Sequence, residues 1–493
     1  MSSKSDTPSS KNPPGGNFTL DTRSLQLPTG SKPDQPTPPA PAAPKPLSEP
    51  AKADLRTFIE SYTSGPTPKL PGALVHIIDT SSNELFSYGT HNSSIGRALS
   101  PTETVAVTFS VSKVIGAIAF LQLVDRGLVQ LDDPRVIADK LPELARKKVH
   151  VGTKENEDGT KEWMFEDRKT DITPRMLMSH SWGGGHSLFH SALADWMGRP
   201  ERGVSHMECN ETNDWYSTIL DVPLLYQPGT KALYSHGPNW ISVLHERITG
   251  RRLDEYMQEE MFGKMELKKI GFEGQYMGEV AARKEGEKEG PYWPNTFLRD
   301  GKFVPFSGTN ETWMEKIERP DAFPVGKHHW IPTDSGIVAA VADVARLLSI
   351  LALPNAGLDP VTGNRILSAE AVKQITSPQL PEGIKNTGRH IISETVPDAL
   401  YPVDLEAEHN DPGGCFGLCG NVQKKDRILK SGKKGRSKGT FSWYGAANTE
   451  YWVDSEKGII AVLNGNCRPW NLDVWLGLRD GVEERIYAAL EKA

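Results

Sequence analysis

Strand-like hydrophobic runs lie near the two ends of the chain. Residues 73–79 and 84–88 are short apolar runs separated by a polar turn, which predicts a β-hairpin. Residues 441–453 and 459–464 flank a second turn that ends in a glycine, and they predict further strands. We therefore expect a sheet built from both ends of the chain.

Helical spacing of apolar residues prevails between these runs. From residue 111 to residue 126 the apolar positions follow an i, i+3, i+4 pattern, and Gly127 provides a C-terminal stop. Because this helix is apolar almost all round, it should be buried. Further helical segments are expected at residues 54–62, 173–178, 239–249, 253–262, 343–352 and 473–490.

These patterns predict an α/β sheet domain with a mainly helical region, roughly residues 130–330, inserted between its two parts. Within that region, residues 151–170 are charged and are expected to form a surface excursion. Residues 1–50 are rich in proline and serine and poor in large apolar side chains, so they should be a disordered tail. Residues 51–493 are expected to form one domain.

The composition narrows the class of protein. Of the 493 residues, 37% are hydrophobic and 24% are charged, and the formal net charge is −7. The apolar run 114–124 is well short of the roughly 20 residues that a bilayer-spanning helix needs, so no membrane partner is expected. The mildly acidic balance argues against nucleic acid as a partner. The chain begins without the apolar segment of a secretory signal and has only four cysteines, so we expect a cytoplasmic protein.

The most specific chemical feature is Ser110-Val111-Ser112-Lys113, at the start of the long apolar helix. Ser110 and Lys113 are three residues apart, so they share one helix face and their side chains can meet. A serine at a helix N-terminus lies near unpaired backbone N–H groups, which favour developing negative charge. A lysine in an apolar helix should have a lowered pKa, as a base beside a nucleophile needs. The alternative is that Ser110 is only a helix cap and Lys113 a solvated side chain.

Together with three later segments, this motif resembles the serine β-lactamase and penicillin-binding-protein superfamily, and more closely its class-C-like esterase and transesterase branch. The similar segments are, in chain order, Ser110-x-x-Lys113, residues 173–184, Gln227-Pro228-Gly229-Thr230 with Tyr234-Ser235-His236, and residues 334–346. The resemblance runs from about residue 50 to the C-terminus. It implies the α/β (α+β) fold of that superfamily, an antiparallel sheet flanked by helices. It also implies a covalent acyl-serine mechanism without a metal or an organic cofactor.

The resemblance gives Tyr234 a place against Ser110 and Lys113. Its phenol would act as an anionic base or as a proton shuttle between these two side chains. The sequence leaves open which of Lys113 and Tyr234 is the general base. It also leaves open the alternative that Tyr234 is a half-buried aromatic residue in a turn.

Residues 441–446 match the strand that carries the third motif of the superfamily, Lys-Thr-Gly in β-lactamases and His-x-Gly or Trp-x-Gly in esterase-like members. By that match Gly445 lies beside the substrate. The N–H groups of Ser110 and Ala446 would then form the oxyanion hole.

Two positions depart from the β-lactamase pattern. Trp443 replaces the cation that would bind the carboxylate of a penicillin or a D-Ala peptide, and His236 replaces the asparagine of Tyr-x-Asn. Both departures favour an ester-type substrate with an apolar part, which His236 would contact and for which Trp443 and Trp182 would offer stacking surface. The alternative for each tryptophan is an ordinary place in the core.

Three histidines are close together in sequence, and His186-x-x-x-His190 has the spacing of zinc ligands on a helix. However, no glutamate completes a His-Glu-x-x-His motif, and a glycine-rich turn precedes the pair. We therefore expect no metal site. A substrate contact by His186 is the other functional interpretation.

Residues 424–438, here called the basic stretch, carry many cations and one acid, Asp426, just before the strand with Trp443. The cations are Lys424, Lys425, Arg427, Lys430, Lys433, Lys434, Arg436 and Lys438. One interpretation is an electrostatic dock at the mouth of the active site for an acidic acyl donor, such as an acyl-carrier protein or a CoA thioester. The other is a solvated loop.

The sequence therefore predicts a serine esterase or acyltransferase that acts on a small-molecule ester or thioester, as do transesterases of fungal secondary metabolism in this branch. Ser110 would form the acyl-serine, and water or an alcohol would complete hydrolysis or acyl transfer. One alternative is a β-lactamase or D-aminopeptidase-type amide hydrolase, against which the missing Lys-Thr-Gly argues. Another is a non-catalytic scaffold that keeps the fold.

Overall fold

The computed structural model describes residues 44–92, 96–186, 190–197, 222–272, 292–305, 333–384 and 414–492. Most of the expected tail, residues 1–43, lies outside the described residues. Leu47 is only 4% exposed and packs in a core cluster, and the first helix, α1 (Glu49–Thr63), begins before residue 51. Ser48 caps this helix, because its Oγ accepts a hydrogen bond from the Ala51 N–H. The folded part therefore begins a few residues earlier than predicted.

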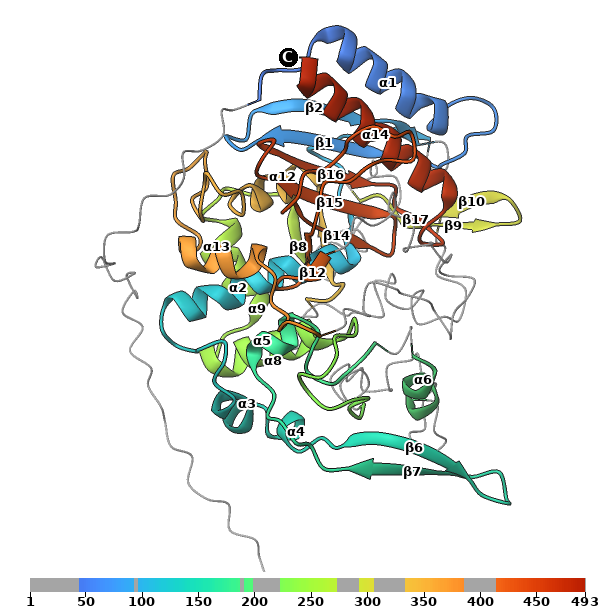
Figure 1. The fold of residues 1–493 in the computed structure, drawn as a ribbon. Helices are drawn as coiled ribbons and strands as arrows, with labels where there is room; N and C mark the ends of the chain where they lie inside the picture. The colour runs from blue at the N-terminus through green and yellow to red at the C-terminus, as the bar shows by residue number, and fades with distance from the viewer. Residues whose placement is uncertain are drawn as a thin grey trace, which may run out of the picture. The chain divides into compact units, whose positions relative to one another are not determined.

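The centre of the fold is a seven-stranded antiparallel sheet with the strand order β12-β13-β14-β15-β16-β1-β2. Strand β1 (Leu74–Asp79) pairs with β16 (Ile459–Asn464), so the two ends of the chain meet within one sheet (Figure 1), as predicted. The remaining strands are β2 (Glu84–Gly89), β12 (Gly414–Phe416), β13 (Asn421–Gln423), β14 (Phe441–Gly445) and β15 (Thr449–Asp454).

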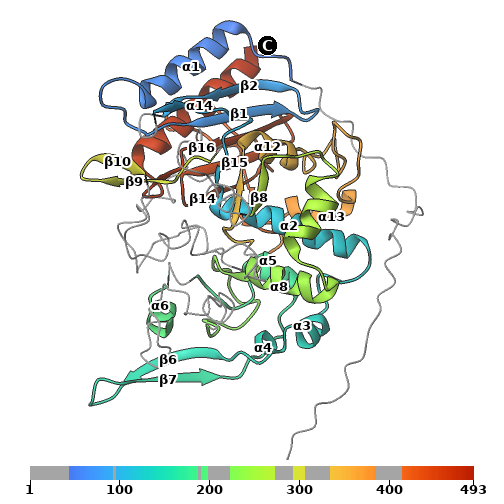
Figure 2. The same cartoon turned by 180° about the vertical axis from the view of Figure 1, so that it is seen from behind.

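Helices cover both faces of this sheet. Side chains of β1 alternate between the faces, so Val75 and Ile77 pack with α1 and α14 (Asp473–Lys492), while Leu74 and Ile78 share a core with α12 (Val341–Ser349). Helices α1 and α14 run side by side over the outer face in both views (Figures 1 and 2). The arrangement is an α/β (α+β) fold of the predicted kind.

The helical region centres on α2 (Ser112–Asp125), which is buried on nearly every side and packs against α8 (Gly237–Thr249). The predicted helix start at residue 173 is also present. Thr173 caps α5 (Pro174–Met178), with its Oγ1 accepting from the Met176 N–H at 3.3 Å. Other described helices are α3 (Arg135–Lys140), α4 (Pro142–Ala145), α6 (Ser191–Met197), α9 (Leu253–Met257) and α13 (Ala369–Thr376).

Small sheets surround this framework. Strand β11 (Ile337–Ala339) lies between β5 (Ala106–Val107) and β8 (Ile270–Phe272), and it reaches the segment just before Ser110. The other small strands are β3 (His91–Asn92), β4 (Arg97–Ala98), β9 (Thr296–Arg299), β10 (Lys302–Pro305) and β17 (Cys467–Arg468).

The structure refines two of the expected segments. The run 441–453 is two strands, β14 and β15, because the chain turns back at residues 446–448 with Asn448 in the left-handed region (φ 54°). The predicted surface excursion is present, and its conformation, which the sequence analysis left open, is a mostly exposed hairpin of β6 (Val149–Glu155) and β7 (Lys161–Glu166).

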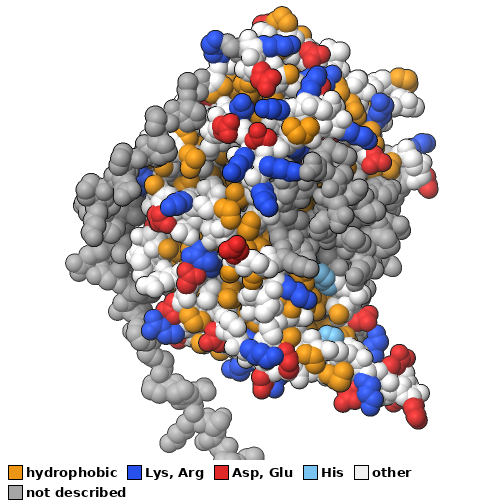
Figure 3. All heavy atoms as spheres, viewed as in Figure 1, with side chains coloured by type: hydrophobic (Ala, Val, Ile, Leu, Met, Phe, Trp, Pro, Cys, Tyr) orange, Lys and Arg blue, Asp and Glu red, His pale blue; other side chains and the backbone are white. Residues whose placement is uncertain are grey.

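The surface carries charges of both signs. On the face seen in Figure 3, Lys and Arg side chains stand among Asp and Glu side chains over the described part of the molecule. Among the described residues, no helix is both long enough and apolar enough to span a bilayer.

Two arginines of the basic stretch are buried in an ion-pair cluster with α14. Arg427 contacts Glu483 and donates to Asp480 at 2.9 Å, while Arg436 lies 3.3 Å from Glu483 and 3.2 Å from Glu450. Arg427 and Glu483 are both 0% exposed. These two cations are therefore neither solvated nor free for docking, which corrects both interpretations of the basic stretch at these positions.

We predict that Glu483→Gln destabilises the fold strongly, because it removes the carboxylate that compensates two buried guanidinium groups. The free energy of unfolding should fall by about 3–5 kcal/mol, measured by urea denaturation. The matched control is Glu484→Gln on the same helix. Its partner Lys433 is 60% exposed, so the change should be about 1 kcal/mol or less. Equal losses in the two variants would contradict a structural role for the buried cluster.

Candidate active site

Ser110 lies in a 3₁₀ turn, Phe109–Val111, that leads directly into α2. Strand β11 holds this turn, because the Thr108 hydroxyl donates to the Ile337 carbonyl (2.7 Å) and the Ile337 N–H donates to Ser112 Oγ (3.1 Å). Ser112 is fully buried, whereas Ser110 is partly exposed. Of the two serines in the motif, Ser110 is therefore the one within reach of a substrate.

The Lys113 ammonium group lies inside the protein, with only 1% of the side chain exposed. It donates to Ser110 Oγ at 3.1 Å and to the Asp334 carbonyl at 2.8 Å, and it stands over the Tyr234 ring at 4.7 Å from its centroid. Burial lowers the pKa of Lys113 to about 8, against the opposing pull of the Asp334 charge. Lys113 thus contacts the Ser110 hydroxyl, and its neutral amine form is accessible near physiological pH.

Tyr234 contacts the same hydroxyl from another side. Its phenol donates to Ser110 Oγ at 2.6 Å. Burial raises the pKa of Tyr234 well above its usual range, although the hydrogen bond with Ser110 opposes this. Tyr234 is therefore a neutral phenol in this arrangement, not a resting phenolate.

Gly445 explains how β14 comes so close to the nucleophile turn. A Cβ at this position would collide with the Thr108 carbonyl oxygen and with Thr449 Oγ1, so only glycine allows the contact. Thr449 Oγ1 itself donates to the Thr108 carbonyl at 3.1 Å. The end of β14 therefore lies against the turn that carries Ser110, and Ala446, the next residue, is partly exposed as Ser110 is.

The two tryptophans differ in position. Trp443 lies on β14 with its ring centroid 5.4 Å from that of Tyr234, and it stacks on Tyr444. Trp182 has no exposed surface, and its indole N–H donates to Ser235 Oγ at 2.8 Å. Trp443 is itself only 3% exposed, so the two rings differ by their neighbours and not by burial. Trp182 supports the segment that carries Tyr234, as the core alternative for this residue implies.

His236 forms a buried pair with Asp334. The distance from His236 Nδ1 to Asp334 Oδ2 is 2.9 Å, and both side chains are 6% exposed. Burial alone would raise the pKa of Asp334, but the hydrogen bond from His236 and the charge of Lys113 lower it to about 2. The sequence analysis assigned no role to Asp334, because 98 residues separate it from His236. Its only distinction there was that it begins the fourth segment similar to the family.

His186 does not form a helical pair with His190, and its ring stacks on that of His236 instead. Helix α6 begins only after His190, and the His186 ring stacks on His236 with centroids 3.9 Å apart. Donor atoms of His186, His236 and Asp334 lie within 4.8 Å of one another, as metal ligands could. The lone pairs of two stacked imidazoles lie in nearly parallel planes and so do not converge on one ion. The nearby Lys113 ammonium would also repel a metal cation. In this arrangement the three groups fit a metal ion poorly, and the expectation that no metal is used stays a prediction.

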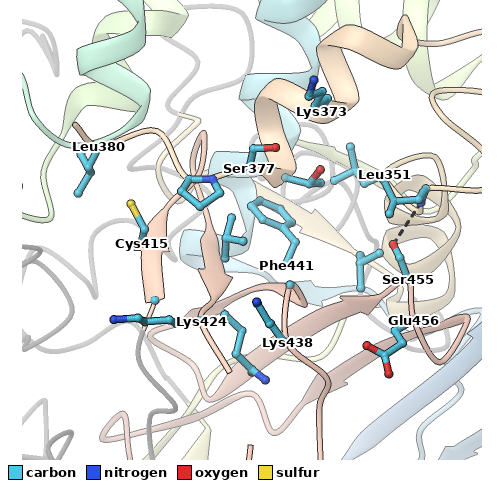
Figure 4. A pocket seen from close by; sticks show the side chains of 18 residues that line it. Leu351, Lys373, Ser377, Leu380, Cys415, Lys424, Lys438, Phe441, Ser455 and Glu456 are labelled. Carbon is cyan, nitrogen blue, oxygen red and sulfur yellow. Dashed lines mark hydrogen bonds between the residues drawn. The ribbon is translucent and has the colours of Figure 1, made fainter. Parts of the chain in front are cut away.

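The basic stretch borders a different cavity. A cavity of about 980 Å³ is lined by Lys424 and Lys438 together with Lys373, Cys415 and Phe441 (Figure 4). Neither Ser110 nor Lys113 nor Tyr234 is among its lining residues. Lys424 and Lys438 therefore border this cavity and do not lie over the mouth of the active site, where the basic stretch was predicted.

Comparison with known proteins gives relatives that include fungal acyltransferases and a fungal esterase. The chain is 26% identical to acyltransferase calJ of Penicillium decumbens over 44% of its length and 29% identical to lovastatin esterase of Penicillium rubens over 40%. These alignments span 54% and 47% of the two relatives, about half of each. Monacolin J acid methylbutanoyltransferase of Aspergillus terreus is 24% identical over 86% of the chain and 93% of the relative.

The fold is shared with solved structures. Unliganded simvastatin synthase (LovD) from Aspergillus terreus superposes with a TM-score of 0.66 at 20% identity, covering 90% of this chain and all of the other. A family model described as Beta-lactamase matches residues 55–474, most of the chain. Together with the arrangement of Ser110, Lys113 and Tyr234, this match shows that the chain belongs to the β-lactamase family.

Proposed function

We propose that this protein is a serine acyltransferase or esterase that forms an acyl-enzyme on Ser110. The observation that carries the proposal is the position of Ser110 Oγ, which receives hydrogen bonds from both Lys113 and Tyr234. Ser110 Oγ attacks the carbonyl carbon of an ester or thioester, its proton moves to Lys113, and the alcohol or thiol part leaves. An alcohol or water then takes the acyl group from Ser110.

Lys113 is the better candidate for the general base of the first step. Its pKa of about 8 leaves a useful neutral fraction near neutral pH, and its Nζ is 3.1 Å from the hydroxyl that loses a proton. Tyr234, with its raised pKa, stays protonated and stabilises the serine oxygen as a hydrogen-bond donor. The phenol can also relay a proton to the leaving group, because the proton that Lys113 took from Ser110 replaces the one the phenol gives, so Tyr234 ends the step protonated.

The N–H groups of Ser110 and Ala446 are proposed as the oxyanion hole. The support is the contact of β14 with the nucleophile turn through Gly445, and the partial exposure of both residues at that junction. In this assignment Gly445 acts through close packing, and Trp443 and His236 flank the substrate.

The substrate is proposed to be a small ester or thioester with an apolar acyl part. Trp443 stands where an amide hydrolase of this family would hold a cation, which argues against a penicillin or a D-Ala peptide. Relatives named as acyltransferase, methylbutanoyltransferase and esterase favour acyl transfer or ester hydrolysis over a non-catalytic scaffold. A CoA or carrier-protein thioester as the donor remains part of the proposal, without support from the basic stretch at Arg427 and Arg436, which are buried.

We predict that brief mixing with p-nitrophenyl butyrate adds one butyryl group to the protein. Intact-protein mass spectrometry detects the adduct, and peptide mapping should place it on Ser110. Ser110→Ala should abolish both the adduct and the release of p-nitrophenol, because Ser110 Oγ is the hydroxyl to which both Lys113 and Tyr234 donate hydrogen bonds. An adduct that persists in this variant would refute the assignment of the nucleophile.

We predict that the rate constant of acylation rises with pH and levels off above about pH 8. Below the pKa of Lys113 the ammonium form cannot accept the Ser110 proton, and above it the neutral amine prevails. The initial burst of p-nitrophenol, recorded from neutral to alkaline pH with Ser110→Ala as the baseline, measures this. A burst rate that falls as pH rises would argue against Lys113 as the base.

We predict that Tyr234→Phe slows acylation by about 100-fold or more, the usual effect of losing a group that assists proton transfer. The phenyl ring keeps its packing against His180 and Trp443, so the fold should persist. Tyr487→Phe on α14 is the control, because its hydroxyl is also buried and donates to Asp454 at 2.7 Å. The control should lose some stability but acylate at the wild-type rate, and similar rates in both variants would exclude a role for the Tyr234 hydroxyl.

A further inference from the structure

The position of the asparagine in Tyr-x-Asn is occupied here by a histidine with a buried carboxylate partner. His236 is 5% exposed, and its Nε2 has no hydrogen-bond partner among the described residues. Buried polar atoms are usually paired. The unpaired Nε2 of His236, two residues after Tyr234 in the chain, is therefore open to a partner that arrives with the substrate in the proposed site.

The hydrogen bond with Asp334 fixes which nitrogen of His236 carries the proton. A carboxylate whose pKa is about 2 only accepts hydrogen bonds, so Nδ1 at 2.9 Å from Oδ2 must be the donor. In a neutral imidazole the proton is then absent from Nε2, which presents a lone pair. An asparagine amide could donate at this place, whereas neutral His236 can only accept there.

Several titratable groups lie close to His236. The titratable groups near it are Asp334 and Lys113, together with His180 and His186, and burial keeps the pKa of both these histidines well below the usual range. Asp334 contacts both Lys113, through its carbonyl, and His236, through its carboxylate.

We infer that His236, oriented by Asp334, is a second general base of this site and takes the proton of the acyl-acceptor hydroxyl in the deacylation step. The inference rests on the proposed acyl-serine function. It gives the two half-reactions different bases, Lys113 for acylation and His236 for deacylation.

The proton count shows why a second base is useful. When a thiolate or a p-nitrophenolate leaves as an anion, the proton of Ser110 stays on Lys113, which then cannot serve as a base. The acceptor oxygen forms its bond to the acyl carbon while its proton moves to His236 Nε2. The bond between the acyl carbon and Ser110 Oγ breaks as Oγ takes the proton from Lys113. His236 finally releases one proton to solvent, which balances the anion that left.

The test compares acylation and deacylation in one experiment. The enzyme is mixed with p-nitrophenyl butyrate and excess 1-butanol, the burst of p-nitrophenol gives acylation, and mass spectrometry of the butyryl-enzyme gives its lifetime. His236→Asn, which restores the amide of the family motif, should lengthen that lifetime by about 100-fold or more. The burst rate should change far less, so this variant accumulates as the butyryl-enzyme.

His236→Gln and Asp334→Asn test the same step independently. Asp334→Asn should lengthen the butyryl-enzyme lifetime less than His236→Gln, because it keeps the imidazole of His236. His245→Asn is the control, a buried histidine of α8 that packs on Tyr256 outside the site. It should leave the butyryl-enzyme lifetime unchanged. The burst amplitude counts folded active sites, so a variant that folds poorly lowers the amplitude without altering the lifetime.

Two results separate the inference from the function on which it rests. If wild-type protein forms no adduct on Ser110, the proposed function itself fails. If wild type is acylated and turns over, but His236→Asn leaves the lifetime unchanged or slows both steps equally, the deacylation role of His236 is overturned and the acyl-serine function stands.

Discussion

The burial of the Lys113 ammonium is the constraint on which the site depends. A cation with 1% exposure is stable only where the protein supplies compensating groups, and each group here comes from a different part of the chain. The Asp334 carbonyl and carboxylate come from the segment before β11, the aromatic ring from Tyr234, and the accepting hydroxyl from the preceding turn. Placing Lys113 inside α2 therefore forces these segments together, and the same burial lowers its pKa toward that of a usable base.

The sheet supplies a second constraint, the rigid placement of the nucleophile turn. The Asn464 side chain of β16 donates to the Val107 carbonyl at 3.1 Å, and Thr449 of β15 donates to the next carbonyl along the chain. The C-terminal strands thus bind the backbone directly before Ser110, while β14 approaches the same turn through Gly445. A sheet assembled from both chain ends fixes the position of a serine that the helical region then surrounds.

The parts of the site that could be predicted from the sequence are those with a local signature. Ser110 and Lys113 lie three residues apart at the start of an apolar helix, so their contact follows from helical geometry alone. Tyr234 and Gly445 required the motif resemblance, because nothing in their own neighbourhoods indicates that they meet Ser110. Asp334 was missed, since a hydrogen bond across 98 residues leaves no pattern in the sequence.

The errors have equally physical causes. A run of cations in sequence does not reveal that Arg427 and Arg436 face carboxylates of a distant helix, so the basic stretch was interpreted as solvated or as a dock. Trp182 follows Ser181 and precedes glycines, a setting typical of a loop, yet its ring is fully buried and bonded to Ser235, in agreement with the core alternative and not with the stacking role. The replacement of the family's asparagine by His236 matters more for the choice of substrate than either of these errors. Together with Trp443 in place of a cation, it removes a donor and a positive charge that would hold an amide substrate with a carboxylate. In their place the structure has the buried Trp443 ring against Tyr234 and the unpaired Nε2 of His236. We propose that these two features suit an apolar acyl group and an incoming hydroxyl.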